Sequence, residues 1–294
     1  MIFGELKSFI DLMIWLKSLL HKKGEQQLSH SVTSRFLQVF FNHGVHHNQI
    51  PQYCSQALNL AQINNAEKLA EVLTPKILEQ TSTFFGIRQD WLIGASKIIY
   101  NVHDFYKEPR QMVTFLEEIK KSRNYTTCTV LRCRDKSANL RETPGIFVFS
   151  EIVSEINNRP VFRHHFCGLQ AIGYWKSRAD FAACCALIIK SEIPTFGHFA
   201  DEDWLKSAYD GLSMPEYDYD LGELILPNKG IWNVYDFIEF PNLYLSELDT
   251  EGGIAVSFAL NRWLMWANSG VITFLYSEEE TEAIIASFEK AIDN

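Results

Sequence analysis

The chain has 294 residues, of which 47% are hydrophobic and 21% are charged, a composition that excludes extensive disorder. Its length exceeds one typical domain of about 100–150 residues, so we expect two or three units. The formal net charge of −9 is uneven, with +1 over residues 1–94 and −10 over residues 95–294. This asymmetry predicts different roles for the two parts, and +1 is a weak footprint for nucleic-acid binding.

The first thirty residues are predicted to form an amphipathic helix followed by a polar linker. Phe3, Leu6, Ile10 and Met13 recur at helical spacing, and the polar stretch that begins at His21 breaks the pattern. Charged residues interrupt the apolar run, so it does not read as a membrane span. We expect this helix to pack on the protein body or on a second subunit, with no membrane partner. A helix lying on a membrane surface is the alternative.

Residues 31–95 contain a series of short helical patterns. "VTSRFLQVFFNHGV" and "HNQIPQYC" are followed by "NLAQINNAEKLAEVL", which has apolar residues at helical spacing. Thr74 is expected to cap the next helix, with Pro75 at its first position and Gly86 ending it in the left-handed conformation. Asp90 is expected to cap a further short helix, with Trp91 and Leu92 folding back on the preceding one.

The stretch from Leu60 to Gly94 resembles the second half of a Cro/CI-type (XRE) helix-turn-helix domain. Ile63 and Glu67 stand where that family's recognition helix has an inward Ile and, four residues later, a Glu. Phe85-Gly86-Ile87 and Asp90-Trp91-Leu92-Ile93-Gly94 follow the order and spacing of its closing turn. The sequence departs from the family after the Glu, where Lys68-Leu69 replaces the usual Gly. It also departs at Pro51, where the second helix often has Ala.

The resemblance implies DNA binding through amide side chains, which suit adenine in the major groove. The candidate contacts that it implies are Asn48, Gln49, Asn59, Gln62, Asn64 and Asn65. Nearby basic residues are few, and His43, His46 and His47 would add positive charge only when protonated. A degenerate bundle that serves dimerisation or partner contact therefore stays open as the alternative.

Residues 96–294 mix strand and helix patterns. A helix is expected within "DFYKEPRQMVTFLEEIKKS", and strands in "TTCTVLRCR", "GIFVFSEIV" and "PVFRHHFCGL". "SRADFAACCALIIKS" fits a buried helix or a strand equally, while Ser277 and Glu280 form a capping box that opens the last helix. The predicted fold class is multi-domain α and α+β. A helix-turn-helix-like bundle is followed by a larger mixed α/β domain over residues 96–294.

Few residues in the second part suggest chemistry. His165 and Cys167 would share one face of a strand and are weak metal-ligand candidates, which His103, His198, Cys128 or Cys133 would complete only if the fold brought them close. Acidic runs near Asp201 and Asp218 read as solvated loops, and we find no nucleophile elbow, phosphate loop or dinucleotide motif. The many Trp and Tyr residues permit an apolar ligand pocket.

The sequence thus predicts a dimeric, cytoplasmic, DNA-binding transcriptional regulator with a C-terminal ligand-sensing or oligomerisation domain and no cofactor. The cytoplasmic location follows from six scattered cysteines and the lack of a recognisable secretory signal, which together favour reduced thiols. The alternative is an enzyme or a small-ligand-binding α/β protein with a degenerate helical bundle.

Overall fold

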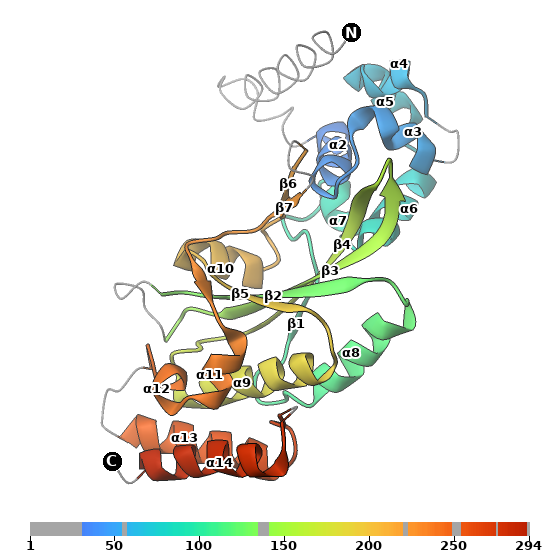
Figure 1. Ribbon diagram of the computed structural model, residues 1–294. Coiled ribbons are helices and arrows are strands. Elements are labelled where there is room, and N and C mark those ends of the chain that lie inside the picture. The colour runs from blue at the N-terminus through green and yellow to red at the C-terminus, as the bar shows by residue number, and fades with distance from the viewer. Residues whose placement is uncertain are drawn as a thin grey trace. The chain divides into compact units, whose positions relative to one another are not determined.

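The computed structural model describes residues 31–54, 58–134, 141–219, 223–248, 254–274 and 276–292. The chain separates into two compact units, Met1–Ile99 (unit 1) and Tyr100–Asn294 (unit 2). Figure 1 shows the helices and strands of both units. The helix and linker predicted for residues 1–30 lie outside the described residues.

The described part of unit 1 consists of helices and turns. In chain order its elements are α2 (Val32–Asn42), the 3-10 turn η1 (His47–Gln49), α3 (Ile50–Tyr53), α4 (Leu60–Ile63), α5 (Ala66–Val72), α6 (Pro75–Phe85) and α7 (Gln89–Leu92). Aromatic rings fill its core. The Phe40 ring centroid lies 4.9 Å from that of Phe36 and 4.9 Å from that of Phe85, so α2 and α6 share one apolar contact.

The predicted ends of α6 are confirmed, whereas the predicted cap of α7 is wrong. The Thr74 hydroxyl accepts from the Ile77 N–H, Pro75 is the first helical residue, and Gly86 adopts φ 70°. Helix α7 starts two residues earlier than expected, with Arg88 at the cap and Gln89 as the first helical residue, so Asp90 lies in its first turn.

The closing turn of α7 contacts the preceding helix α6, on which the sequence predicts it to fold, and it also packs on α2. Trp91 and Leu92 are buried. The Arg35 guanidinium donates to the Trp91 carbonyl and lies 5.3 Å from the Trp91 ring centroid. These contacts join α2 to α7, the first and the last described helices of unit 1.

The single helix expected to run through Ile63 and Glu67 is broken. Asn64 ends α4, and the Asn65 side chain caps α5 by accepting from the Lys68 N–H at 2.9 Å. Asparagine favours caps because its short amide competes with helical hydrogen bonding, and two in succession interrupt the helix here. Ile63 is buried, as expected, and Glu67 is exposed.

Unit 2 is built on a mixed six-stranded sheet, and its fold is of the α+β class. The strand order is β1-β4-β3-β2-β5-β8. The strands are β1 (Val102–Asp104), β2 (Thr126–Arg132), β3 (Gly145–Ile156), β4 (Arg159–Leu169), β5 (Thr195–Phe199) and β8 (Ile231–Trp232). Strands β2, β3 and β4 pair antiparallel, whereas β1 pairs parallel to β4 and β2 parallel to β5. The three strands predicted from sequence are β2, β3 and β4.

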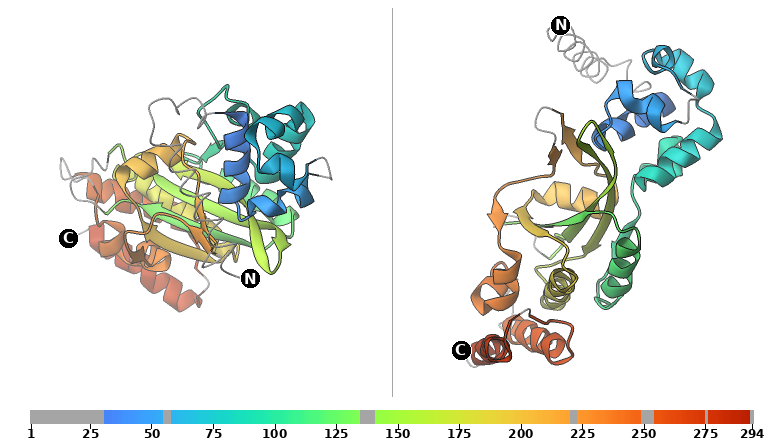
Figure 2. Two further views of the ribbon diagram at one scale, coloured as in Figure 1. Left: turned by 90° about the horizontal axis from the view of Figure 1, so that it is seen from above. Right: turned by 45° about the vertical axis from the view of Figure 1, so that its right-hand side comes forward.

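Helices cover both faces of this sheet. The remaining elements are α8 (Gln111–Lys121), α9 (Trp175–Lys190), α10 (Glu202–Tyr209), the hairpin β6 (Glu216–Asp218) and β7 (Glu223–Ile225), α11 (Val234–Glu239), α12 (Pro241–Tyr244), α13 (Ile254–Asn268) and α14 (Glu278–Ile292). Figures 1 and 2 show α8 and α9 on one face and α10 on the other. A side chain added at Gly145 would meet Phe181 of α9, and one added at Gly168 would meet Tyr209 of α10.

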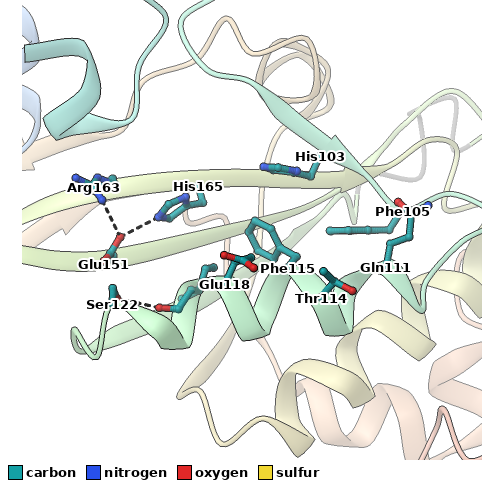
Figure 3. Close-up of a pocket in the computed structure, with 11 residues that line it drawn as sticks. His103, Phe105, Gln111, Thr114, Phe115, Glu118, Ser122, Glu151, Arg163 and His165 are labelled. Carbon is teal, nitrogen blue, oxygen red and sulfur yellow. Dashed lines mark hydrogen bonds and ion pairs between the residues drawn. The ribbon is translucent and has the colours of Figure 1, made fainter. Parts of the chain in front are cut away.

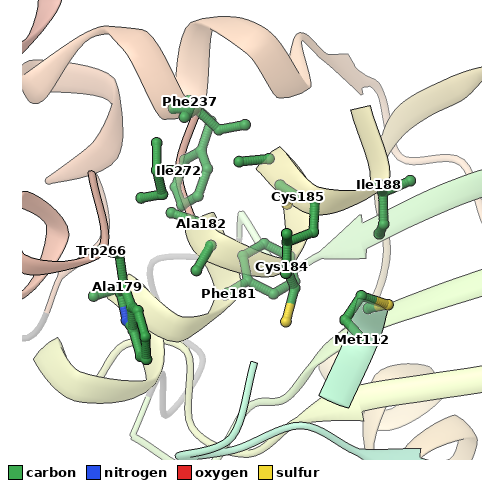
Figure 4. Packing of buried hydrophobic residues seen from close by; sticks show 14 of the residues in the cluster. Met112, Ala179, Phe181, Ala182, Cys184, Cys185, Ile188, Phe237, Trp266 and Ile272 are labelled. Atoms are coloured by element: carbon green, nitrogen blue, oxygen red, sulfur yellow. The ribbon is translucent and has the colours of Figure 1, made fainter. Parts of the chain in front are cut away.

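The segment "SRADFAACCALIIKS", whose sequence fits a helix or a strand equally, forms helix α9, and this helix is buried on nearly every side. Phe181 stacks on Phe147 of β3 with ring centroids 4.9 Å apart, and Cys184 and Cys185 are fully buried (Figure 4). A helix that is apolar on every side shows little periodicity, so its sequence alone could not separate it from a core strand.

One buried carboxylate ties the C-terminal helices to α9. Asp180 is fully buried and accepts from Arg262 Nε at 2.9 Å and Nη2 at 2.7 Å, from Trp266 Nε1 at 2.9 Å, and from the backbone N–H of Lys107 at 3.0 Å. Arg262 and Trp266 belong to α13, so Asp180 fixes α13 on α9.

The predicted capping box at the start of α14 is present, with Glu280 accepting from the Ser277 N–H at 3.0 Å. In the described ranges, every helix is too short or insufficiently apolar to cross a bilayer.

Candidate ligand-binding site

A cavity of about 580 Å³ in unit 2 lies between α8 and the sheet (Figure 3). We call it the α8 pocket. Its lining comprises His103 of β1, Phe105, five residues of α8 (Gln111, Thr114, Phe115, Glu118 and Ile119), Ser122, Glu151 of β3, and Arg163 and His165 of β4. Pockets that bind small organic molecules typically enclose about 300–1,000 Å³.

The pairing of the strands brings the polar lining residues to one face of the sheet. Glu151 stands opposite Arg163 in the β3–β4 ladder, and His165 follows Arg163 by two residues. Alternate residues of a strand share a face, so Glu151, Arg163 and His165 all point toward α8. His103 joins them because β1 pairs parallel with β4, which places His103 opposite Cys167.

Glu151 is a buried, ionised carboxylate. It is only 2% exposed, and it accepts from His165 Nε2 at 3.0 Å and from Asn124 Nδ2 at 2.7 Å, while Arg163 Nη1 lies 3.6 Å away. The hydrogen bond from His165 contributes most to lowering the pKa of Glu151 to about 2, against the opposing effect of burial. The charge of this carboxylate is therefore already matched within the protein.

The imidazole of His103 makes no hydrogen bond to the described residues. Its ring instead lies 4.8 Å from the Phe115 centroid and 6.5 Å from the Phe105 centroid. Burial, and then repulsion from the nearby His165, lower the pKa of His103 below 6.5. His103 is therefore mainly neutral at pH 7, and no residue in the described ranges hydrogen-bonds to its ring nitrogens.

Three apolar side chains, Phe105 and the α8 residues Phe115 and Ile119, form one part of the lining, which we call the apolar wall. The Phe115 ring packs on Phe149 of β3 at 5.2 Å and faces His165 edge-on at 6.2 Å. The pocket thus combines this apolar wall with polar side chains of α8 and with a polar floor on the sheet. Glu151, Arg163 and Phe115 are absent from the sequence-based candidates; the spacing of two residues between Arg163 and His165 in a predicted strand was the available signal that they share a face.

The proposed metal pair shares a strand face as predicted, but the structure does not bring its members into one site. Cys167 is fully buried in the core, and burial raises the pKa of its thiol well above the usual range, so the thiolate that a metal requires is disfavoured. His165 is engaged by Glu151. Among the described residues, no group of three His, Cys, Asp or Glu side chains is placed to hold a metal ion.

Most of the amides suggested for DNA contact serve as local caps in unit 1. Asn59 and Gln62 form a reciprocal capping box at α4, Asn65 caps α5, and Gln49 accepts from the His46 N–H at 2.9 Å. Asn48 and Asn64 are exposed.

Two histidines of unit 1, His43 and His47, add little positive charge at neutral pH. Burial lowers the pKa of His43 to about 4, and burial together with repulsion from His46 lowers that of His47 to about 4. The support for phosphate binding expected from protonated histidines is therefore missing at these two positions.

A second cavity, of about 380 Å³, lies at the start of α9. Its lining includes Tyr174, Trp175, Phe258 and Arg141. It is smaller than the α8 pocket and is lined mainly by apolar side chains.

Comparison with protein-family models, with curated proteins and with solved structures finds no match to this chain. Its function is therefore argued from the geometry of its own residues.

Proposed function

We propose that this chain is a ligand-binding regulator, in which unit 2 binds a small organic molecule in the α8 pocket and unit 1 contacts DNA. The first part of this proposal, ligand binding by unit 2, rests on the α8 pocket. It places the rings of Phe105 and Phe115 beside eight polar lining residues, and its volume of about 580 Å³ suits a ligand of one or two rings.

Binding is favoured over nucleophilic catalysis at this site. His165 and Glu151 form a carboxylate–imidazole pair, which in many enzymes activates a hydroxyl or thiol. Within the described part of the chain, no Ser, Thr or Cys side chain hydrogen-bonds to His165. The pair therefore has no positioned nucleophile to activate, and its role here is to hold the polar floor of the pocket.

A ligand-observed NMR screen of a small fragment library tests the pocket. Thr114 is an exposed residue of α8 on the pocket lining, so Thr114→Trp fills the cavity without touching the core. We expect a subset of fragments to give saturation-transfer signals with the natural chain and to lose them with Thr114→Trp. A screen in which the same fragments bind both proteins equally would refute a ligand role for the α8 pocket.

We propose DNA contact for unit 1 on a separate observation. The order of its helices, the left-handed Gly86 and the buried Trp91 turn support a helix-turn-helix-like bundle that precedes the larger α+β unit. Exposed Asn48 and Asn64, together with Lys68, would supply polar contacts. We further propose a homodimer, which would present two such helices to half-sites about 34 Å apart, and a cytoplasmic location, which six free and buried cysteines support.

The charge of unit 1 limits how strongly it holds DNA. Residues 31–99 contain five Lys or Arg and four Asp or Glu. Arg35 donates to the Trp91 carbonyl and Arg88 pairs with Asp90 at 2.7 Å, which leaves Lys68, Lys76 and Lys97 for phosphates. Three phosphate contacts predict a salt dependence with a log–log slope of about −3.

Fluorescence anisotropy with sheared genomic DNA across a salt series tests this part of the proposal. We expect Asn64→Ala combined with Lys68→Gln to weaken binding, and Lys120→Gln, on exposed α8 of unit 2, to leave it unchanged. No binding at low salt, or the same affinity in the double variant, would refute DNA contact. Light scattering on the purified chain tests the dimer.

A further inference from the structure

We infer that the α8 pocket is selective for an aromatic carboxylate, whose ring packs on Phe115 and Phe105 and whose carboxylate is bound by a protonated His103. This inference rests on the proposed ligand-binding role and names the chemical class of the ligand. It also predicts that each ligand bound at neutral pH brings about one proton with it.

The pocket can gain a positive charge when an imidazole is protonated, whereas both of its carboxylates already have partners. Glu151 is already ionised and is matched by donors from His165 and Asn124 and by nearby Arg163. Glu118 of α8 is paired with Lys121. A cationic ligand therefore finds both lining carboxylates engaged, whereas an anionic ligand can be met by protonation of an imidazole.

His103 is the lining residue best placed to respond in this way. The titratable or charged groups that line the same cavity are His165 and Arg163 on β4, Glu151 on β3, and Glu118 on α8. On its own strand, Asp104 is held by the Tyr209 hydroxyl at 2.8 Å and the Tyr106 N–H at 2.9 Å. With no hydrogen bond to the described residues, His103 is free to donate to a bound carboxylate.

The apolar wall selects for a ring. His103 and Phe105 lie nearly parallel, at 10°, with centroids 6.5 Å apart, and Phe115 stands 4.8 Å from the imidazole. A planar ligand placed beside these rings gains offset or edge-to-face contacts while its substituent stays within reach of the imidazole. The volume of about 580 Å³ accommodates two fused rings.

Two matched probes, 2-naphthoate and the neutral 2-naphthamide, separate charge from shape. We expect calorimetry to show at least about tenfold tighter binding of the naphthoate near pH 6, because a charge-assisted hydrogen bond exceeds a neutral one. Between pH 6 and pH 8 the naphthoate affinity should fall by up to about tenfold per pH unit, as one proton is taken up with each ligand. Titrations in two buffers of different ionisation heat report that proton directly.

Two histidine variants assign the proton. His103→Gln keeps a hydrogen-bonding side chain on an exposed position of β1, and should abolish both the preference for naphthoate and its pH dependence. His198→Gln, on β5 and outside the pocket lining, should change neither.

The outcomes distinguish this inference from the proposed function. Equal binding of both probes, blocked by Thr114→Trp, would overturn the carboxylate preference and keep the pocket as a ligand site. Binding of neither probe would also overturn the inference, and the fragment screen then decides the pocket's role independently. A pH dependence that survives His103→Gln would remove His103 from the account.

Discussion

Replacing Asp180 by Asn should loosen the C-terminal helices from the rest of unit 2. The carboxylate is fully buried and is the shared acceptor for the Arg262 guanidinium, the Trp266 indole and the Lys107 N–H. An amide has the same shape, but it carries no charge, and one of its two ends must turn an N–H toward these donors.

The magnitude follows from what is left behind. The Arg262 side chain is 16% exposed, so Asp180→Asn leaves most of a guanidinium buried without its counter-charge. Breaking a buried ion pair in this way costs about 3–5 kcal/mol. For a unit of this size that corresponds to a decrease in melting temperature of roughly 6–20 °C.

Urea unfolding and hydrogen exchange test this prediction together. Asp210→Asn is the matched control, because Asp210 is exposed at the end of α10 and its loss should change stability by less than about 0.5 kcal/mol. Exchange should accelerate first in α13 and α14. In a double-mutant cycle, Arg262→Met should cost much less in the Asp180→Asn background than alone. A stability within 1 kcal/mol of the natural chain, or additive effects in the cycle, would refute the reasoning.

Three further predictions concern separate features. Arg178 is 1% exposed, and its Nε and Nη2 have no hydrogen-bond partner among the described residues, so Arg178→Met should leave urea stability unchanged or higher; a loss above about 2 kcal/mol would mean that the guanidinium is satisfied by water or an anion. Gly197→Ala places a methyl group 2.3 Å from the Trp232 carbonyl oxygen, so it should separate β5 from β8 and lower the free energy of unfolding by about 1–3 kcal/mol. Gly270→Ala meets no atom within 4 Å, so its cost of about 1–2 kcal/mol should come only from the backbone φ of 71°. Losses near zero for both variants would contradict these expectations. The pKa of His43 is lowered from 6.5 to about 4, so the unfolded state binds the proton first, and unit 1 should lose up to about 3 kcal/mol as the pH falls through this interval; a urea midpoint that changes equally in His43→Gln would contradict this.

Features encoded by a few neighbouring residues were predictable from the sequence. The ends of α6 depend on Thr74, Pro75 and Gly86, whose cap, fixed φ and left-handed conformation act within one helical turn. The capping box at Ser277 has the same local character. The break at Asn64 and Asn65 was missed because the apolar spacing on either side of it continues as though the helix were whole.

The α8 pocket could not be predicted because its residues meet only through distant pairings. His103 reaches the site because β1 pairs with β4, and Glu151 faces Arg163 because of the β3–β4 register. The sequence marked His165 as a possible metal ligand, yet its partner is a carboxylate fourteen residues earlier on the neighbouring strand. Residue types alone indicated possible ligand-binding side chains, and the pairing of the strands determines which of them line the α8 pocket.

The measurement that tests the account most directly is an NMR experiment on chain labelled in its Phe and Tyr rings, with 2-naphthoate added. Intermolecular NOEs from the naphthalene protons identify which rings the ligand touches. We expect NOEs to Phe105 and Phe115 of the α8 pocket. NOEs confined to Tyr174 and Phe258, which line the second cavity, or to rings elsewhere in the chain, would contradict it.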